Sequence, residues 1–228
     1  MSFYHFEQGK RMQIELTGPS RKPYSGGKAK QLVVVLHGWG ADGANLIDLA
    51  DMLSPTLPDA HFIAPNAPYV CEVNPYGYQW FSLMDRHPQH MLDGVRGAAE
   101  ILDRFLDDQL KALGLDNSKL AIMGFSQGTM TGLHVALRRS PQIAALVGFS
   151  GALIAPELLQ TEIKTRPPVC LIHGEADDVV PFHSLDLATK GLAAAGIKAE
   201  TTARPYLGHS IDMDGIRLAG AFLKKAFA

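Results

Sequence analysis

The residues whose types and spacing most clearly suggest chemistry are Gly-Phe-Ser-Gln-Gly at positions 124–128. An apolar run at 119–123 precedes them and indicates a buried strand, and residues 129–139 after them indicate a helix. A serine flanked by glycines at a sharp strand-to-helix turn presents its hydroxyl above a sheet. The glycines leave room for the chain to turn around a strained serine. This pattern predicts that Ser126 is a catalytic nucleophile.

A serine hydroxyl attacks well only when a base accepts its proton, so the chain must also supply a histidine. Within the predicted elements, His134 falls inside a helix, His173 closes a strand and His183 begins a helix. His209 instead lies in a loop between the last predicted strand and the last predicted helix. The chain order nucleophile, acid, histidine places the base in that loop. We therefore predict that His209 is the base.

Three carboxylates compete for the role of the acid, and all follow a predicted strand at 169–172: Glu175, Asp177 and Asp178. The acid must accept the imidazole N–H and stay ionised, which fixes the histidine tautomer and stabilises the imidazolium. Spacing alone leaves Asp177 and Asp178 as alternatives.

An oxyanion needs two backbone donors, and the first is the N–H of the residue after the nucleophile, Gln127. The second is expected from the loop after an early strand. Here the strand at 31–36 leads into His-Gly-Trp-Gly at 37–40, and the Trp39 N–H is the predicted donor. Ser150 also ends a strand, but it lacks the second glycine and a following helix, so it is not predicted as the nucleophile.

The elements that must position these residues alternate along the chain. Residues 31–36 form an unbroken apolar run of the kind buried on both faces of a parallel sheet. Further strands are predicted at 12–16 (an antiparallel edge strand), 60–64, 144–149, 169–172 and 199–203, and helices at 44–53, 95–113, 184–195 and 211–227. This alternation predicts a mostly parallel, doubly wound α/β sheet flanked by helices, in a single domain spanning residues 1–228. Each candidate site residue follows the carboxyl end of a strand, where such sheets bind ligands.

Composition narrows the classes of function. The formal net charge is −2 with no basic stripe, which argues against a nucleic-acid partner. Residues 1–10 lack the apolar core of a signal peptide, and no apolar run reaches the ~18–20 residues of a membrane span. Only two cysteines are present, Cys71 and Cys170, which favours the reducing cytoplasm. Nucleotide motifs are missing, and His87 and His90 stand without further metal ligands, so no cofactor is predicted.

These motifs, taken in order, resemble the phospholipase/carboxylesterase family of small α/β-hydrolases, which includes the acyl-protein thioesterases. The resemblance runs from about Leu32 to the C-terminus and rests on Leu-His-Gly-Trp-Gly-Ala-Asp-Gly (36–43), Pro-Asn-Ala-Pro (65–68), Trp-Phe (80–81), residues 124–128, His-Gly-Glu-Ala-Asp (173–177), Val-Pro (180–181) and Gly-His (208–209). It implies an α/β-hydrolase fold with Ser126 as nucleophile, Asp177 rather than Asp178 as acid and His209 as base. Trp39 and Gln127 match the oxyanion positions.

The resemblance also bears on the substrate. Residues 69–90 form a long stretch rich in Tyr, Trp and Pro, and by resemblance it is a lid-like segment over the acyl groove. Tyr78, Trp80 and Phe81 are the groove candidates. The family often has Leu at position 39, so the larger Trp39 is expected to narrow the acyl pocket. The family also often has Asp where this chain has Ser82, so the contacts of that Asp are not carried over to this chain. Relatives often dimerise near the site, which raises a homodimer as an assembly to test.

The function expected from all this is a serine carboxylesterase acting on short- to medium-chain carboxylic esters. An acyl-protein thioesterase or lysophospholipase with the same triad is the alternative, so the partner is a small-molecule or lipid acyl ester. A binding protein on the same fold is the alternative from another class, but it would not require Ser126, Asp177 and His209 together.

Overall fold

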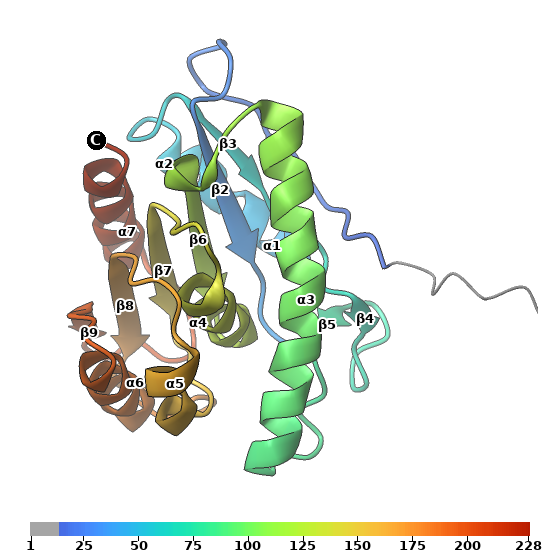
Figure 1. Ribbon diagram of the computed structural model, residues 1–228, viewed down its shortest axis with the longest axis vertical. Coiled ribbons are helices and arrows are strands. Elements are labelled where there is room, and N and C mark those ends of the chain that lie inside the picture. Colours follow the sequence, from blue (N-terminus) through green and yellow to red (C-terminus); the bar gives the residue numbers. More distant parts are fainter. Residues whose placement is uncertain (1–13) are drawn as a thin grey trace, which may run out of the picture.

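The computed structural model describes residues 14–228, which are built around a seven-stranded sheet in the order β1-β3-β2-β6-β7-β8-β9 (Figure 1). The strands are β1 (Ser20–Arg21), β2 (Gln31–Leu36), β3 (Ala60–Ile63), β6 (Leu120–Phe125), β7 (Ala145–Phe149), β8 (Val169–Gly174) and β9 (Glu200–Arg204). Every neighbouring pair is parallel except β1 with β3. The predicted mostly parallel sheet is confirmed.

Helices cover both faces of this sheet (Figure 1). They are α1 (Gly43–Ile47), α2 (Leu49–Leu53), α3 (Pro88–Leu113), α4 (Gln127–Arg138), α5 (Leu159–Glu162), α6 (His183–Ala194) and α7 (Met213–Ala226), with 3-10 turns η1 (Asn117–Lys119) and η2 (Pro156–Leu158). Alternate side chains of β2 belong to two hydrophobic cores, one on each face of the sheet. Val34 belongs to the core cluster that also holds residues of α3, α4 and α6, whereas Val33 belongs to the cluster that holds residues of α1, α2 and α7. The unbroken apolar run at 31–36 is therefore explained, because both faces are buried.

The chain reverses its direction across the sheet between β2 and β6. It passes from β2 to β3 on one side and then returns to place β6 on the other side of β2. Such a reversal opens a crevice at the carboxyl ends of the two strands, where ligands bind. The loop at 37–40 leaves β2 there, and Ser126 leaves β6 there.

Three predicted elements differ from the structure. The helix expected at 44–53 is two short helices separated by Asp48, and the first is capped at Asp42 by a reciprocal bond with Asn45. The edge strand expected at 12–16 is absent from 14–16, and residues 12–13 lie outside the described residues. The edge strand is β1 instead, and it follows Gly18, where a Cβ would lie 2.1 Å from the Ala64 carbonyl oxygen.

The helix expected at 95–113 begins earlier, at Pro88, because His87 caps it and proline fits its first position. The stretch before it is not irregular throughout, since β4 (Tyr69–Val70) and β5 (Tyr78–Gln79) pair as a small antiparallel hairpin. Among the described residues, no helix is long and apolar enough to cross a bilayer. The single domain predicted for residues 1–228 stays a prediction.

Candidate active site

The turn between β6 and α4 holds Ser126 in an unusual backbone conformation, with φ 54° and ψ −117°. A non-glycine residue at positive φ costs roughly 1–3 kcal/mol and persists only when its surroundings fix it. Both neighbouring glycines are required by close contacts. A Cβ on Gly128 would lie 2.1 Å from the Leu36 carbonyl oxygen, and one on Gly124 would lie 2.5 Å from the Gly128 carbonyl carbon. The sharp strand-to-helix turn expected from the sequence is therefore present.

Asp177 and His209 meet although 32 residues separate them: His209 Nδ1 lies 2.8 Å from Asp177 Oδ2. The second carboxylate oxygen, Oδ1, accepts the backbone N–H groups of Val179 (3.0 Å) and Val180 (2.9 Å). Burial disfavours the charge, but the bonds from His209, Val180 and Val179 outweigh it and hold the pKa of Asp177 below its usual value. Asp178, the alternative acid, is exposed and makes none of these contacts.

This pairing fixes the proton on His209. An ionised carboxylate only accepts hydrogen bonds, so Nδ1 donates, and in the neutral imidazole Nε2 is then the nitrogen that can accept a proton. The ring lies against Phe125, with ring centroids 4.8 Å apart. Ser126 and His209 both line one cavity, although no hydrogen bond joins their side chains in the part of the chain that the structure describes.

The loops that carry the acid and the base are tied to each other. The Ala176 N–H donates to the Leu207 carbonyl (2.9 Å). His173, 2% exposed, places Nε2 at 2.9 Å from the Val180 carbonyl and 3.3 Å from Asp177 Oδ2. Because a carbonyl only accepts, that nitrogen donates. His173 shapes the acid turn, as its place before a glycine suggests.

His37 anchors the predicted oxyanion loop. Its Nε2 accepts the Ala67 N–H (2.9 Å) and its Nδ1 donates to the Gly38 carbonyl (2.8 Å), so the ring is neutral. Burial lowers the pKa of His37 and supports this state. The indole N–H of Trp80 donates to the His37 carbonyl (3.0 Å). The motif at 37–40 is thereby joined to the Pro-Asn-Ala-Pro segment at 65–68.

The two predicted oxyanion donors belong to loops that touch. A Cβ on Gly38 would lie 3.2 Å from the Ser126 Cβ, which brings the loop beside the elbow. Trp39 is fixed by its indole bond to Gln79 (2.9 Å). In the described part of the chain, the backbone N–H groups of Trp39 and Gln127 donate to no protein acceptor.

The Gln127 side chain has a second role that the sequence did not reveal. Its oxygen accepts the Trp80 N–H (2.9 Å) and its nitrogen donates to the Phe81 carbonyl (2.8 Å), all in the buried interior. The residue after the predicted nucleophile thus holds the start of the segment that follows the β4–β5 hairpin. Ser82, where the family often has Asp, donates to Glu72 (2.8 Å) and joins the hairpin to that segment.

The cavity at Ser126 has a volume of about 310 Å³. It is lined by Gly38, Trp39, Ala41, Leu83, Arg86, Met91, Phe125, Ser126, Met130, Val179, Val180, Pro181 and His209. The groove candidates Tyr78, Trp80 and Phe81 do not line it. Trp80 and Phe81 are buried beside it, and the Tyr78 backbone braces the loop by pairing with Gly40 (2.9 Å) and Ala41 (2.7 Å). Trp80 and Phe81 belong instead to the hydrophobic core.

The apolar wall includes residues that the sequence did not single out. Leu83 lies within the predicted groove-covering segment at 69–90, Met91 follows in α3, and Met130 is one turn into α4. The available signal was positional: Met130 lies four residues after Ser126, on the same helix face. Ser150, set aside as a nucleophile, is 1% exposed and does not line the cavity.

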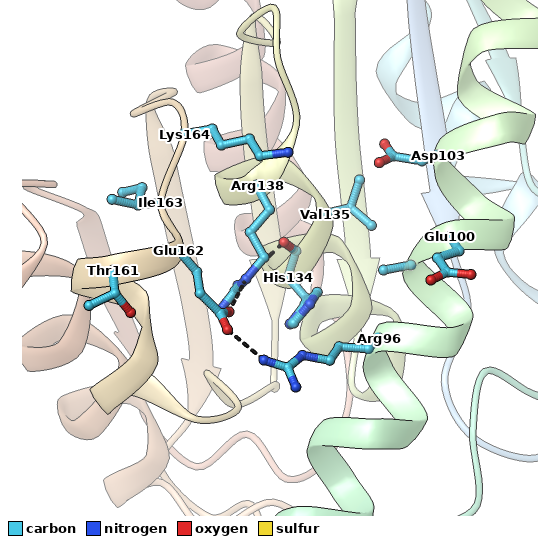
Figure 2. Close-up of a pocket in the computed structure, with 11 residues that line it drawn as sticks. Arg96, Glu100, Asp103, His134, Val135, Arg138, Thr161, Glu162, Ile163 and Lys164 are labelled. Atoms are coloured by element: carbon cyan, nitrogen blue, oxygen red, sulfur yellow. Dashed lines mark hydrogen bonds and ion pairs between the residues drawn. The ribbon is translucent and has the colours of Figure 1, made fainter.

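A second cavity, of about 530 Å³, lies between α3, α4 and α5 and contains none of these residues (Figure 2). Glu162 bridges Arg96 and Arg138 there, at 2.5 Å and 2.7 Å. His134 lines this cavity and is 5% exposed. Burial, with the charge of Arg138, lowers the pKa of His134 to about 4. Nothing in this cavity resembles a nucleophile and its base, so the first cavity is the candidate active site.

Comparison with known proteins identifies the family. A family profile described as Phospholipase/Carboxylesterase matches residues 23–227. The chain belongs to the phospholipase/carboxylesterase family. Its structure is similar to that of the esterase PE8, with TM-score 0.89 and 42% identity over 93% of this chain and all of that chain.

Curated relatives agree with this assignment. Acyl-protein thioesterase 1 of Eremothecium gossypii is 27% identical, covering 92% of this chain and 94% of the relative. Esterase YpfH of Escherichia coli is 26% identical, covering 84% and 81%. The resemblance and the α/β-hydrolase fold are confirmed, and the chain is a serine hydrolase of this family.

Relief of strain at the elbow gives a first prediction. The free energy of unfolding of Ser126→Gly is expected to be about 1 kcal/mol higher than that of Ser126→Ala. Glycine adopts a positive φ without strain, and the extra conformational entropy that it loses on folding offsets only part of this gain. Urea unfolding of the two variants measures the difference. In an ordinary helical position, Ala221→Gly should show the opposite sign. Equal stability of the two Ser126 variants would contradict the strain.

The Gln127 contacts give a second prediction. Gln127→Ala leaves the buried Trp80 N–H and Phe81 carbonyl without hydrogen-bond partners, so it should lower the free energy of unfolding by about 2–4 kcal/mol. Gln127→Met fills the same space without polar atoms, so it separates lost hydrogen bonds from lost volume. We expect Met to remain close to Ala in denaturant unfolding. Recovery of wild-type stability in Gln127→Met would show that packing, not hydrogen bonding, matters at this position.

His134 gives a prediction about acid stability. Its pKa is about 6.5 unfolded and about 4 folded, so the unfolded chain binds more protons between these values. The stability that depends on neutral His134 is complete above about pH 6.5 and is lost as the pH falls toward 4, up to about 3 kcal/mol. Wild type should therefore lose more stability than His134→Gln between neutral pH and about pH 4.5. Exposed His183→Gln is the control, and an identical loss in wild type and His134→Gln would refute the linkage.

Proposed function

We propose that this chain is a carboxylesterase that hydrolyses short- to medium-chain carboxylic esters with a triad of Ser126, His209 and Asp177. The observation that carries the proposal is the 2.8 Å bond from His209 Nδ1 to the buried Asp177 carboxylate. It leaves His209 Nε2 able to accept a proton in the cavity that Ser126 lines.

The reaction follows from these positions. Ser126 Oγ attacks the ester carbonyl carbon while His209 Nε2 takes the hydroxyl proton. Negative charge develops on the carbonyl oxygen and is stabilised by the Trp39 and Gln127 N–H groups. His209 then gives its proton to the departing alcohol oxygen and leaves an acyl-enzyme. Water, deprotonated by His209, attacks the acyl-enzyme, and Ser126 recovers its proton as the acid departs.

The size of the cavity supports a modest acyl chain. About 310 Å³ lies at the lower end of the ~300–1,000 Å³ of small-molecule sites. A thioester or lysophospholipid substrate uses the same chemistry, and one relative is named acyl-protein thioesterase 1.

Two free, buried thiols, Cys71 and Cys170, support a cytoplasmic location within the same proposal. The homodimer raised by the resemblance is tested by light scattering, which should report twice the chain mass.

The triad is tested with 4-nitrophenyl butyrate. Ser126→Ala should abolish burst and turnover, and Asp177→Asn should lower kcat roughly 10³–10⁴-fold through the wrong His209 tautomer. Asp178→Asn is the matched control, because Asp178 is adjacent, exposed and free of these contacts, and it should behave as wild type. Full activity in Ser126→Ala, or no difference between the two Asn variants, would end the proposal.

Acyl length and leaving group are tested by a panel of esters and thioesters read as kcat/KM. Each methylene that enters the apolar cavity adds up to about 0.8 kcal/mol, so kcat/KM should rise with chain length and then fall when the cavity is full. A steep fall beyond about four carbons would exclude lipidated substrates, since their chains carry many more methylenes.

A further inference from the structure

The cavity at Ser126 has an apolar lining that contains one formally charged side chain, Arg86. Leu83 lies on the same segment as Arg86, Met91 lies in the first turn of α3 just after it, and Val179 and Val180 form another part of the lining. Among the described residues, no carboxylate lines the cavity, and the Asp177 side chain is fully buried behind His209. Any charge on a bound substrate therefore meets Arg86 without a competing anion in the lining.

The loop that carries Arg86 is fixed by its neighbours. Asp85, the nearest carboxylate in sequence, accepts the His87 N–H (2.8 Å) and lies 2.6 Å from His90 Nδ1, so it is bonded to the first turn of α3. In the part of the chain that the structure describes, Arg86 forms no ion pair and no side-chain hydrogen bond. Its guanidinium is thus available to a ligand, whereas that of Arg21 is bound to Asp48 and Asp51.

A guanidinium presents parallel N–H donors that match the two oxygens of a carboxylate. Arg86 is exposed, so water and salt screen such a pair, and its selectivity rests on this bidentate fit and on the absence of a competing carboxylate in the lining. A single arginine with no second cation in the lining suits a carboxylate monoanion better than a phosphate, which usually gathers several donors.

Resting on the proposed esterase function, we propose that the preferred substrates carry a carboxylate besides the scissile ester, and that Arg86 binds it. The substrate class is then a half-ester of a dicarboxylic acid, or an ester of a hydroxy acid. Ser126 attacks the ester carbonyl as before, and the pendant carboxylate takes no part in bond making. Its role is to place the chain along the apolar wall formed by Leu83 and Met91.

The test compares isosteric substrates that differ only in charge. For the acyl side these are ethyl hydrogen adipate and its neutral carboxamide, and for the alcohol side butyryl glycolate and its amide. Each kcat/KM is divided by the hydroxide-catalysed rate of the same ester, so intrinsic reactivity cancels. Wild type should prefer the anion by about tenfold in one of the two pairs, and that pair reports which side Arg86 binds.

Variants of Arg86 then assign the preference. Arg86→Gln should bring the anion-to-neutral ratio to about one, Arg86→Lys should keep part of it, and Arg86→Glu should reverse it. Arg217→Gln, which removes the same charge from the exposed face of α7, should leave the ratio unchanged. Added salt should reduce the wild-type ratio more than that of Arg86→Gln.

A wild-type ratio near or below one in both pairs, or a ratio that survives Arg86→Gln, would overturn the proposal. Loss of the esterase proposal itself appears differently, as absent hydrolysis of the neutral esters or full activity in Ser126→Ala. Circular dichroism of Arg86→Gln and Arg86→Lys confirms folding, and the conservative lysine variant keeps the comparison valid if glutamate disturbs the loop.

Discussion

The structure of the site depends on a backbone conformation that Ser126 would not adopt alone. Several contacts impose it together. The Ser126 N–H donates to the Phe149 carbonyl (2.9 Å), and Thr129 Oγ1 lies 2.8 Å from both the Phe149 and Gly124 carbonyls. Gly128 lies directly against the end of β2. The strain is therefore supported by the central strands β2, β6 and β7, and central strands are generally among the last parts of a domain to open.

Gln127 connects this turn to the rest of the site. Its backbone N–H faces the developing oxyanion in the proposed reaction, and its side chain forms hydrogen bonds with the backbone of Trp80 and Phe81. Trp80 in turn donates to the His37 carbonyl, and the Tyr78 backbone pairs with the oxyanion loop. The two residues proposed to donate to the oxyanion, Trp39 and Gln127, and the segment after the β4–β5 hairpin thus form one connected unit. Preorganised donors stabilise charge without the cost of reorientation, which is what such a unit provides.

Much of this arrangement is visible in the sequence, because it rests on short-range pattern. Unbroken apolar runs at 31–36 and 119–123 predict central strands, and the glycines around Ser126 predict the elbow. What the pattern misses depends on contacts between distant segments. Aromatic residues at 78–81 indicate a groove by composition, yet Trp80 is buried by its bond to His37 and by Gln127. Similarly, spacing cannot separate Asp177 from Asp178, because only the folded turn shows which carboxylate the Val179 and Val180 N–H groups stabilise.

The electrostatics of the cavity follow from the same geometry. Catalysis in the proposed mechanism requires negative charge to be stabilised at the carbonyl oxygen, and the N-terminal end of α4 supplies a favourable potential there. That potential would be weakened by any exposed carboxylate in the cavity, and Asp177 avoids this by lying fully buried and bonded to His209. A cavity free of lining carboxylates is therefore a condition of oxyanion stabilisation. Once that condition is met, a positive side chain at the wall, such as Arg86, reinforces the same potential and at the same time selects which esters enter.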